Sequence, residues 1–141
     1  MKQMMDMHTF CYKPVLKALP ENLQRMVCRM PMPVLKDLEE IRIREDRPLM
    51  VYSRGRDYFL CQDGRLNSDP GGAYITTRQD IQRLLQLISE YSIYALQEEM
   101  RSGYITIKGG YRIGLAGKAV VEDGKIKTLQ HISSFNIRIT R

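Results

Sequence analysis

A pair of adjacent glycines between two apolar runs is the feature that most constrains how this 141-residue chain can fold. Gly109 and Gly110 separate the run Tyr104–Ile107 from the run Ile113–Val121. Glycine adopts the positive φ that tight hairpin turns require, so the stretch predicts two antiparallel strands joined by a short loop. The stretch lacks the G-x-x-x-x-G-K-[ST] pattern of a P-loop, which leads from a strand into a helix.

Two roles can be assigned to the glycines in and around this hairpin. Such glycines more often mark turns, bulges and close strand packing, and this is the role that we predict for them. The alternative is that their backbone N–H groups hold a phosphate. The residues concerned are Gly103, Gly109, Gly110, Gly114 and Gly117.

Two other stretches alternate apolar and polar residues with the period of a β-strand. Glu40–Glu45 has the sequence EIRIRE, and Phe135–Thr140 has the sequence FNIRIT. This alternation is typical of strands with one buried and one exposed face, so their arginines project from one face if both belong to one sheet. An arginine fixed on a strand can bind phosphate through two hydrogen bonds, and pairing with surface carboxylates is the alternative. The arginines on or beside these predicted strands are Arg42, Arg44, Arg112 and Arg138.

Helices are predicted at the N-terminus and between the two β-regions. Pro14 and Pro20 each begin a helix, because proline suits a first helical turn. Thr77 is predicted to cap a longer helix, with Asp80 as the acidic partner in a capping box. Ser92 is predicted to cap a second helical segment, and a single bent helix is the alternative.

Short strands and loops complete the predicted fold. Leu49–Tyr52 and Asp57–Cys61 are predicted strands, Asn67–Gly72 is a predicted loop, and His131–Ser134 is a predicted link between strands. Together the patterns predict an α+β fold with a mostly antiparallel sheet from two β-regions, a central helical pair and N-terminal helices.

The length of the chain suits one ordinary domain. We expect a loose N-terminus over residues 1–13 and a single α+β domain over residues 14–141. No apolar run approaches the roughly 20 residues of a transmembrane helix, and the first ten residues lack the apolar core of a signal peptide. We therefore expect an intracellular protein.

The net charge of +6 lies entirely in the last part of the chain. From Arg101 onward there are eight lysines and arginines but only two acidic residues, whereas the two signs cancel before that point. A localised basic surface favours a phosphate-bearing or acidic partner. A solvated surface without a partner is the alternative.

No metal site and no catalytic residue is predicted. The three cysteines are far apart, and neither histidine lies at the spacing of a metal ligand. The acidic pairs Glu39–Glu40 and Glu98–Glu99 are predicted to be solvated, although the second pair has Arg101 or Arg112 as an alternative partner. Motifs of serine hydrolases, zinc proteases and EF-hands are missing as well, so the chain alone is not expected to be an enzyme.

Four blocks of the sequence resemble the stage III sporulation protein AA family of endospore-forming bacteria. They are EIRIR with the following RP (Glu40–Pro48), SIYALQEEMRSGYIT (Ser92–Thr106), GGYRIGLAGKAV (Gly109–Val120) and the closing FNIRITR. The blocks cover most of the chain and occur in the order of the family.

The resemblance implies a protein of two parts. In the family, an N-terminal domain precedes a P-loop ATPase domain related to type II and type IV secretion ATPases, and the strand similar to FNIRITR leads into that domain. This chain is therefore expected to be the N-terminal domain, without the Walker A lysine and without ATP hydrolysis of its own. ATP and magnesium are the cofactors implied for the C-terminal domain, and none is implied for this chain.

The resemblance also implies partners and a location. The expected partners are the protein's own ATPase domain, further copies in a homo-hexamer, and membrane proteins of a channel between mother cell and forespore. The expected location is the mother-cell cytoplasm, at the membrane that surrounds the forespore.

Candidate site residues follow by analogy with the related secretion ATPases. Arginines of their N-terminal domain can reach the phosphates of the bound nucleotide, where positive charge stabilises the transition state of phosphoryl transfer. Arg112 and Arg138 are the first candidates for this role, and Arg42 and Arg44 are the second.

A basic nucleic-acid-binding module is the alternative function. It draws on the same basic C-terminal part of the chain. Only 8% of the residues are aromatic, tryptophan is absent, and no aromatic pair of the RNP type is evident on a predicted strand. Nucleic acid is therefore not the expected partner.

Overall fold

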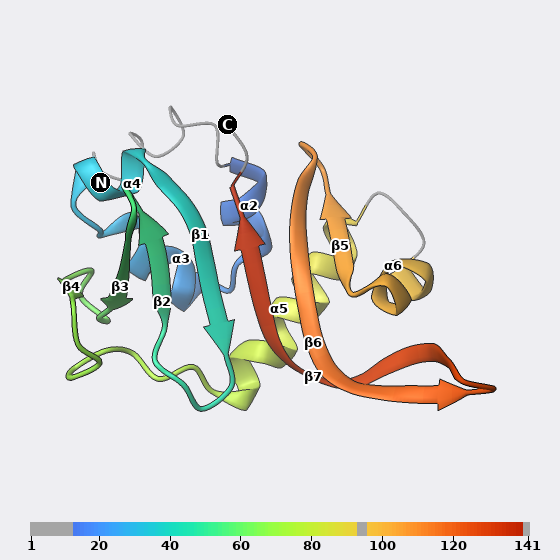
Figure 1. Cartoon of the computed structure of the whole chain (residues 1–141). Helices are drawn as coiled ribbons and strands as arrows, with labels where there is room; N and C mark the ends of the chain where they lie inside the picture. The colour runs from blue at the N-terminus through green and yellow to red at the C-terminus, as the bar shows by residue number, and fades with distance from the viewer. Residues whose placement is uncertain (1–12, 93–95, 140–141) are drawn as a thin grey trace.

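A single antiparallel sheet forms the body of the protein in the computed structural model, which describes residues 13–92 and 96–139 (Figure 1). Its seven strands have the order β4-β3-β2-β1-β7-β6-β5. The strands are β1 (Leu38–Arg44), β2 (Met50–Ser53), β3 (Arg56–Leu60), β4 (Leu66–Asn67), β5 (Tyr104–Ile107), β6 (Tyr111–Glu122) and β7 (Lys125–Arg138). Strand β7, the last in the sequence, lies between β1 and β6 and so joins the two β-regions into one sheet.

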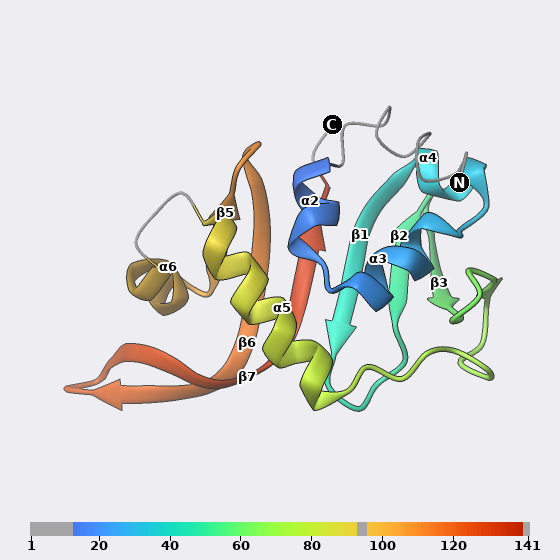
Figure 2. The same ribbon diagram turned by 180° about the vertical axis from the view of Figure 1, so that it is seen from behind.

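The described helices leave one face of the sheet uncovered. Helices α2, α3 and α5 lie over one face, and α6 lies beside β5 at the edge of the sheet (Figures 1 and 2). The described helices are α2 (Lys13–Ala18), α3 (Glu21–Cys28), α4 (Met32–Lys36), α5 (Arg78–Tyr91) and α6 (Leu96–Ser102). The predicted α+β class is confirmed. None of these helices is long and apolar enough to cross a membrane.

A row of branched side chains crosses the covered face of the sheet. Ile41 pairs with Val51 on β2 and with Ile137 on β7, and the row continues through Ile113 to Ile105. Each of these side chains is at most 1% exposed. Because a slip of one residue would turn the whole row toward solvent, this packing fixes which residues lie on the uncovered face.

The hairpin predicted around the glycine pair is confirmed. Strand β5 pairs with β6, Ile107 opposite Tyr111 closes the ladder, and both turn glycines have positive φ. Gly109 has φ 96°, and a Cβ at this position would lie 2.9 Å from the ring of Tyr111. This turn therefore needs glycine for its conformation and also for space.

The start of α5 has the predicted capping box. The Oγ1 atom of Thr77 accepts a hydrogen bond from the Asp80 N–H at 3.1 Å, and the Asp80 carboxylate accepts one from the Thr77 N–H at 3.0 Å. At the other end of α5, Ser92 is extended with ψ 136°, which excludes a single bent helix. Its predicted role as a cap of the next helix depends on residues 93–95, which lie outside the described residues.

Three features of the fold differ from the prediction. His131–Ser134 is not a link but part of β7, because His131 adopts φ 49° opposite a register shift on β6, and this bulge interrupts the alternation. Asn67, predicted to be in a loop, belongs to the short strand β4, and helix α4 was not predicted. The predicted loose N-terminus lies outside the described residues apart from Lys13, which begins α2.

Candidate functional site

The four candidate arginines lie on the uncovered face of the sheet, which we call the open face. Their neighbours in the strands, Ile41, Ile43, Ile113 and Ile137, are buried on the other face. Side chains alternate along a strand, so the residues between these isoleucines project outward. The strands β1, β6 and β7 thus bring together Arg42, Arg44, Arg112 and Arg138.

Two of the arginines belong to a network of ion pairs that extends from β3 across β2 and β1 to β7. Arg42 donates from Nε to the Glu40 carboxylate, and its Nη1 atom lies 3.2 Å from the Asp57 carboxylate. Arg138 Nε lies 3.6 Å from the other oxygen of Glu40. The hydrogen bond to Glu40 raises the pKa of Arg42 above its ordinary value, against the effect of burial. These two guanidinium groups are therefore largely neutralised by Glu40 and Asp57.

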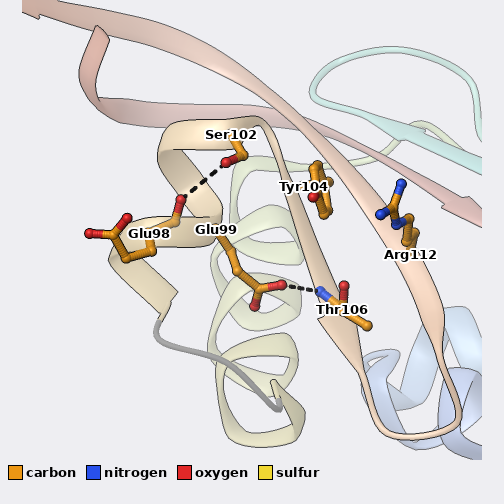
Figure 3. Close-up of a pocket in the computed structure, with 6 residues that line it drawn as sticks. All are labelled: Glu98, Glu99, Ser102, Tyr104, Thr106 and Arg112. Carbon is orange, nitrogen blue, oxygen red and sulfur yellow. Dashed lines mark hydrogen bonds between the residues drawn. The ribbon is translucent and has the colours of Figure 1, made fainter.

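The other two arginines have no carboxylate partner among the described residues. Arg44 donates from Nη2 to the sulfur of Met50 at 3.2 Å. The guanidinium carbon of Arg112 lies 4.4 Å from the centroid of the Tyr104 ring, a cation–π contact that orients the side chain without neutralising it (Figure 3). Arg44 and Arg112 thus retain their capacity to bind an anion.

Each of these arginines lines a shallow hollow. The hollow beside Arg44 has a volume of about 380 Å³ and is also lined by Arg42. Its lining includes three small residues, Gly114, Ala116 and Ser134, together with larger residues of β6 and β7. The hollow beside Arg112 has a volume of about 470 Å³ and lies between β5, β6 and α6 (Figure 3). The small side chains beside Arg44 leave room for an anionic group to approach its guanidinium group, whereas the hollow beside Arg112 is also lined by Glu98 and Glu99.

The acidic residues near Arg112 differ from the prediction of a solvated pair. Glu98 is exposed and lies 3.6 Å from Arg101, one of its two predicted partners. Glu99 is only 7% exposed, and its carboxylate accepts hydrogen bonds from the Ser92 hydroxyl at 2.7 Å and from the Thr106 N–H at 2.8 Å. The prediction of solvation was wrong for Glu99, because α6 folds back onto the β5 edge and encloses it.

Glu40 was also predicted to be solvated, and its side chain is only 12% exposed. The prediction failed because partners from β1 and β7 cover its carboxylate. Sequence reasoning missed Asp57 as well, since it follows Glu40 by 17 positions and meets Arg42 only through the pairing of β1, β2 and β3. The acidic and basic residues that share one face of EIRIRE were the sequence signal that indicated pairing of Glu40 with an arginine.

The glycines of the sequence prediction occupy distinct places. Gly103, Gly109 and Gly110 have positive φ at turns, and Gly103 follows the last residue of α6. Gly114 lies on the open face opposite Asn136, and Gly117 lies in the register shift between Ala116 and Lys118. None of the five lies at the start of a described helix, where a phosphate cradle would need it.

Aromatic side chains accompany the arginines on the open face. Tyr52 pairs with Glu40, Phe59 lies opposite Met50, and Tyr104 lies opposite Gly114. All three are half-buried. In the described part of the chain, no group of His, Cys, Asp and Glu side chains is arranged to hold a metal ion. The open face therefore combines guanidinium groups with aromatic rings, a composition typical of binding surfaces.

The fold and this face define a small α+β domain with a cationic, helix-free sheet surface. A sequence profile described as "Sporulation stage III, protein AA" matches residues 12–141. "Stage III sporulation protein AA" of Bacillus subtilis (strain 168) is 38% identical over 127 residues, which make up 90% of this chain and 38% of that protein. No solved structure matches the chain with significant similarity.

The chain therefore belongs to the stage III sporulation protein AA family, and the resemblance of its four sequence blocks is confirmed. Its family places it among the proteins of sporulation. The chain spans 38% of the length of the curated relative that it matches.

Proposed function

We propose that this chain is the N-terminal assembly and regulatory domain of a secretion-type ATPase that acts in sporulation. Membership of the stage III sporulation protein AA family supports this role. The relative from B. subtilis has more than half of its length outside the matched region. That remaining part is proposed to be the P-loop domain, with ATP and magnesium as its ligands.

One observation carries the proposal: Arg112 and Arg44 lie on a helix-free face without a carboxylate partner among the described residues. Uncompensated guanidinium groups on a rigid sheet can stabilise negative charge that another domain presents to them. Arg42 and Arg138 are less available, because Glu40 binds both. We therefore propose Arg112 as the principal contact to the nucleotide phosphates, with Arg44 second.

The assembly and location belong to the same proposal. The whole protein is proposed to form a homo-hexamer that contacts membrane proteins of a channel between mother cell and forespore. It would act in the mother-cell cytoplasm, at the periphery of the membrane around the forespore. The net charge of +6 is compatible with an anionic surface nearby.

Hydrolysis of ATP by the longer protein tests the role of Arg112. We expect Arg112→Ala to lower kcat at least tenfold, because arginines that reach the transferred phosphate contribute about a thousandfold or more. Arg101→Ala is the matched control, since Arg101 is exposed on α6 and does not line the hollow beside Arg112. Residues 1–141 alone should show no turnover. Unchanged hydrolysis in Arg112→Ala, or turnover by residues 1–141, contradicts the proposal.

The coding sequence beyond codon 141 provides an independent test. A G-x-x-x-x-G-K-[ST] motif between a strand and a helix is the expected result, because that loop holds the phosphates in P-loop proteins. A continuation without this motif would remove the ATPase from the proposal and leave the family assignment unchanged.

A nucleic-acid-binding module is the second candidate, and the aromatic residues of the open face favour it. The Tyr104 ring lies under Arg112, Tyr52 lines a hollow together with Arg138, and bases can stack on such rings. Titration with single-stranded RNA at several salt concentrations separates the two functions. Micromolar binding that weakens steeply with salt supports this candidate, and no binding at low salt rejects it.

A further inference from the structure

The hairpin of β6 and β7 extends beyond the sheet as a two-stranded ribbon. Gly114 is the last residue of β6 opposite β5, and Ser134 is the first residue of β7 opposite β1. From there to the turn at Asp123 and Gly124, the two strands pair only with each other among the described strands. Figures 1 and 2 show the ribbon reaching past the body, with β6 along the margin that is farther from α6.

From Ala116 to Val121, the outer edge of β6 therefore faces no other strand among those that the structure describes. A two-stranded ribbon is marginally stable by itself in water, and exposed strand edges invite pairing with another strand. Val121 near the tip is 61% exposed, more than Met32 or Ile75, which are the other large apolar side chains exposed in the described part of the chain. These features indicate that the ribbon edge is covered in the assembled protein.

The charges along this edge select one way of covering it. Lys118 and Glu122 are both exposed and four residues apart. The register shift between Val120 and Val121 places its extra residue on β7, so β6 keeps its alternation and the two side chains project on the same side of the strand. In an antiparallel pair of two identical strands centred on residue 120, Lys118 lies opposite Glu122 of the partner subunit, and the reverse pair forms by symmetry. Centring the pair on residue 119 or 121 forms neither contact.

We propose that the outer edge of β6 pairs with the same edge of a second copy of this chain, antiparallel and centred on residue 120. A lysine on an exposed edge normally discourages strand pairing. Here the glutamate four positions later makes one register favourable, because the other registers place no carboxylate of the partner strand opposite Lys118. Glu122 also lies opposite Lys125 of its own hairpin, so its carboxylate would lie between two lysines in the dimer. The proposal does not depend on the ATPase role.

Variants that reverse one charge test the register, because a change in dimerisation changes the mass of the particle in solution. The chain of residues 1–141 is expected to dimerise with increasing concentration in analytical ultracentrifugation. Lys118→Glu or Glu122→Lys should each weaken the dimer at least about tenfold, because both symmetric contacts become repulsive. The double variant Lys118→Glu, Glu122→Lys should restore dimerisation. Lys108→Glu makes the same change of charge in the turn between β5 and β6, away from the edge. It should change dimerisation only slightly, through the altered net charge of the chain.

Cysteine cross-linking tests the same register directly. Residues opposite each other in an antiparallel pair have Cα atoms about 4.5–5.5 Å apart, within the range of a disulfide. In a Cys11→Ser background, Val120→Cys should form a disulfide-linked dimer on mild oxidation, whereas Lys118→Cys should not. A mixture of Lys118→Cys and Glu122→Cys should form the mixed dimer. Circular dichroism shows whether each variant is folded.

A chain that stays monomeric at all concentrations, with Val120→Cys not cross-linked, overturns the proposal. A dimer that persists in Lys118→Glu also overturns it, because a different surface must then form the contact. Cross-linking by Val120→Cys together with recovery in the charge-swapped double variant supports it.

Discussion

Asp80 connects the start of α5 to helix α3, which is 58 residues away in the sequence. Its carboxylate accepts hydrogen bonds from the Tyr74 hydroxyl at 2.5 Å, from the Asn22 amide at 3.0 Å and from the Thr77 N–H at 3.0 Å. Burial raises the pKa of Asp80, but these hydrogen bonds together hold it below its ordinary value. The same contact and burial raise the pKa of Tyr74 to about 12. A single charged group thus attaches α3 to the beginning of α5.

We expect Asp80→Asn to destabilise the protein by about 1–3 kcal/mol at neutral pH, because it leaves a buried donor without an acceptor. The folded pKa of Asp80 is depressed, so its stabilisation is complete above the ordinary value near 4 and is lost as pH falls through the folded value. The difference between the wild type and the variant should therefore shrink below about pH 4. Urea denaturation at neutral and acidic pH measures it. Glu90→Gln on the exposed side of α5 is the control, and a difference independent of pH would contradict the assignment.

At the scale of elements, a buried carboxylate helps to fix the position of α6 on the sheet. Glu99 accepts the N–H of Thr106, which points away from β6 at the edge of β5, and also the hydroxyl of Ser92. Helix α6 has only seven residues, too few to be stable alone. Its packing against β5 and β7 and this carboxylate therefore determine its position.

We expect Glu99→Gln to loosen α6 from the sheet, because a neutral amide oxygen is a weaker acceptor than a carboxylate for the Thr106 N–H, and the Ser92 hydroxyl must turn to accept from the amide N–H. The amide of Thr106 should exchange with deuterium faster than in the wild type, and the free energy of unfolding should fall by about 1–3 kcal/mol. Glu98→Gln is the matched control, because Glu98 is exposed and pairs only with Arg101. Its effect should stay within about 0.5 kcal/mol. Unchanged exchange at Thr106 would show that packing alone holds the helix.

Local sequence patterns predicted most of the helices and strands. They could not predict which elements far apart in the sequence contact each other. The alternation in EIRIRE and FNIRIT is a property of neighbouring residues, so it predicted the strands and the shared face of their arginines. The burial of Glu99 depends on where α6 folds back, and the partner of Arg42 depends on the order of three strands. His131 shows the same limit, since a bulge removes the alternation on which the prediction relies.

At the scale of the whole molecule, the two faces of the sheet have different chemistry. One face is covered by α2, α3 and α5 over an apolar core, and the other carries arginines and half-buried aromatic residues without a helix. Strand β7 lies in the middle of the sheet and ends at Arg138, which is on the open face. A polypeptide that continues from β7 therefore starts beside the arginines.

We expect the open face to be covered in the longer family protein, because arginines and aromatic rings are enriched where surfaces become buried. Asn136→Cys places a thiol on this face between Arg42 and Gly114, and Gln86→Cys places one on the exposed side of α5. In a Cys11→Ser background, both should react with a maleimide at similar rates in residues 1–141, since Cys28 and Cys61 are buried. In the longer protein, Asn136→Cys should react at least about tenfold more slowly than Gln86→Cys, because a thiol enclosed by a second domain reacts only when the contact opens. Equal rates in the longer protein would show that the arginines stay exposed to solvent, and the remaining part of the polypeptide would then have to bind elsewhere on this domain.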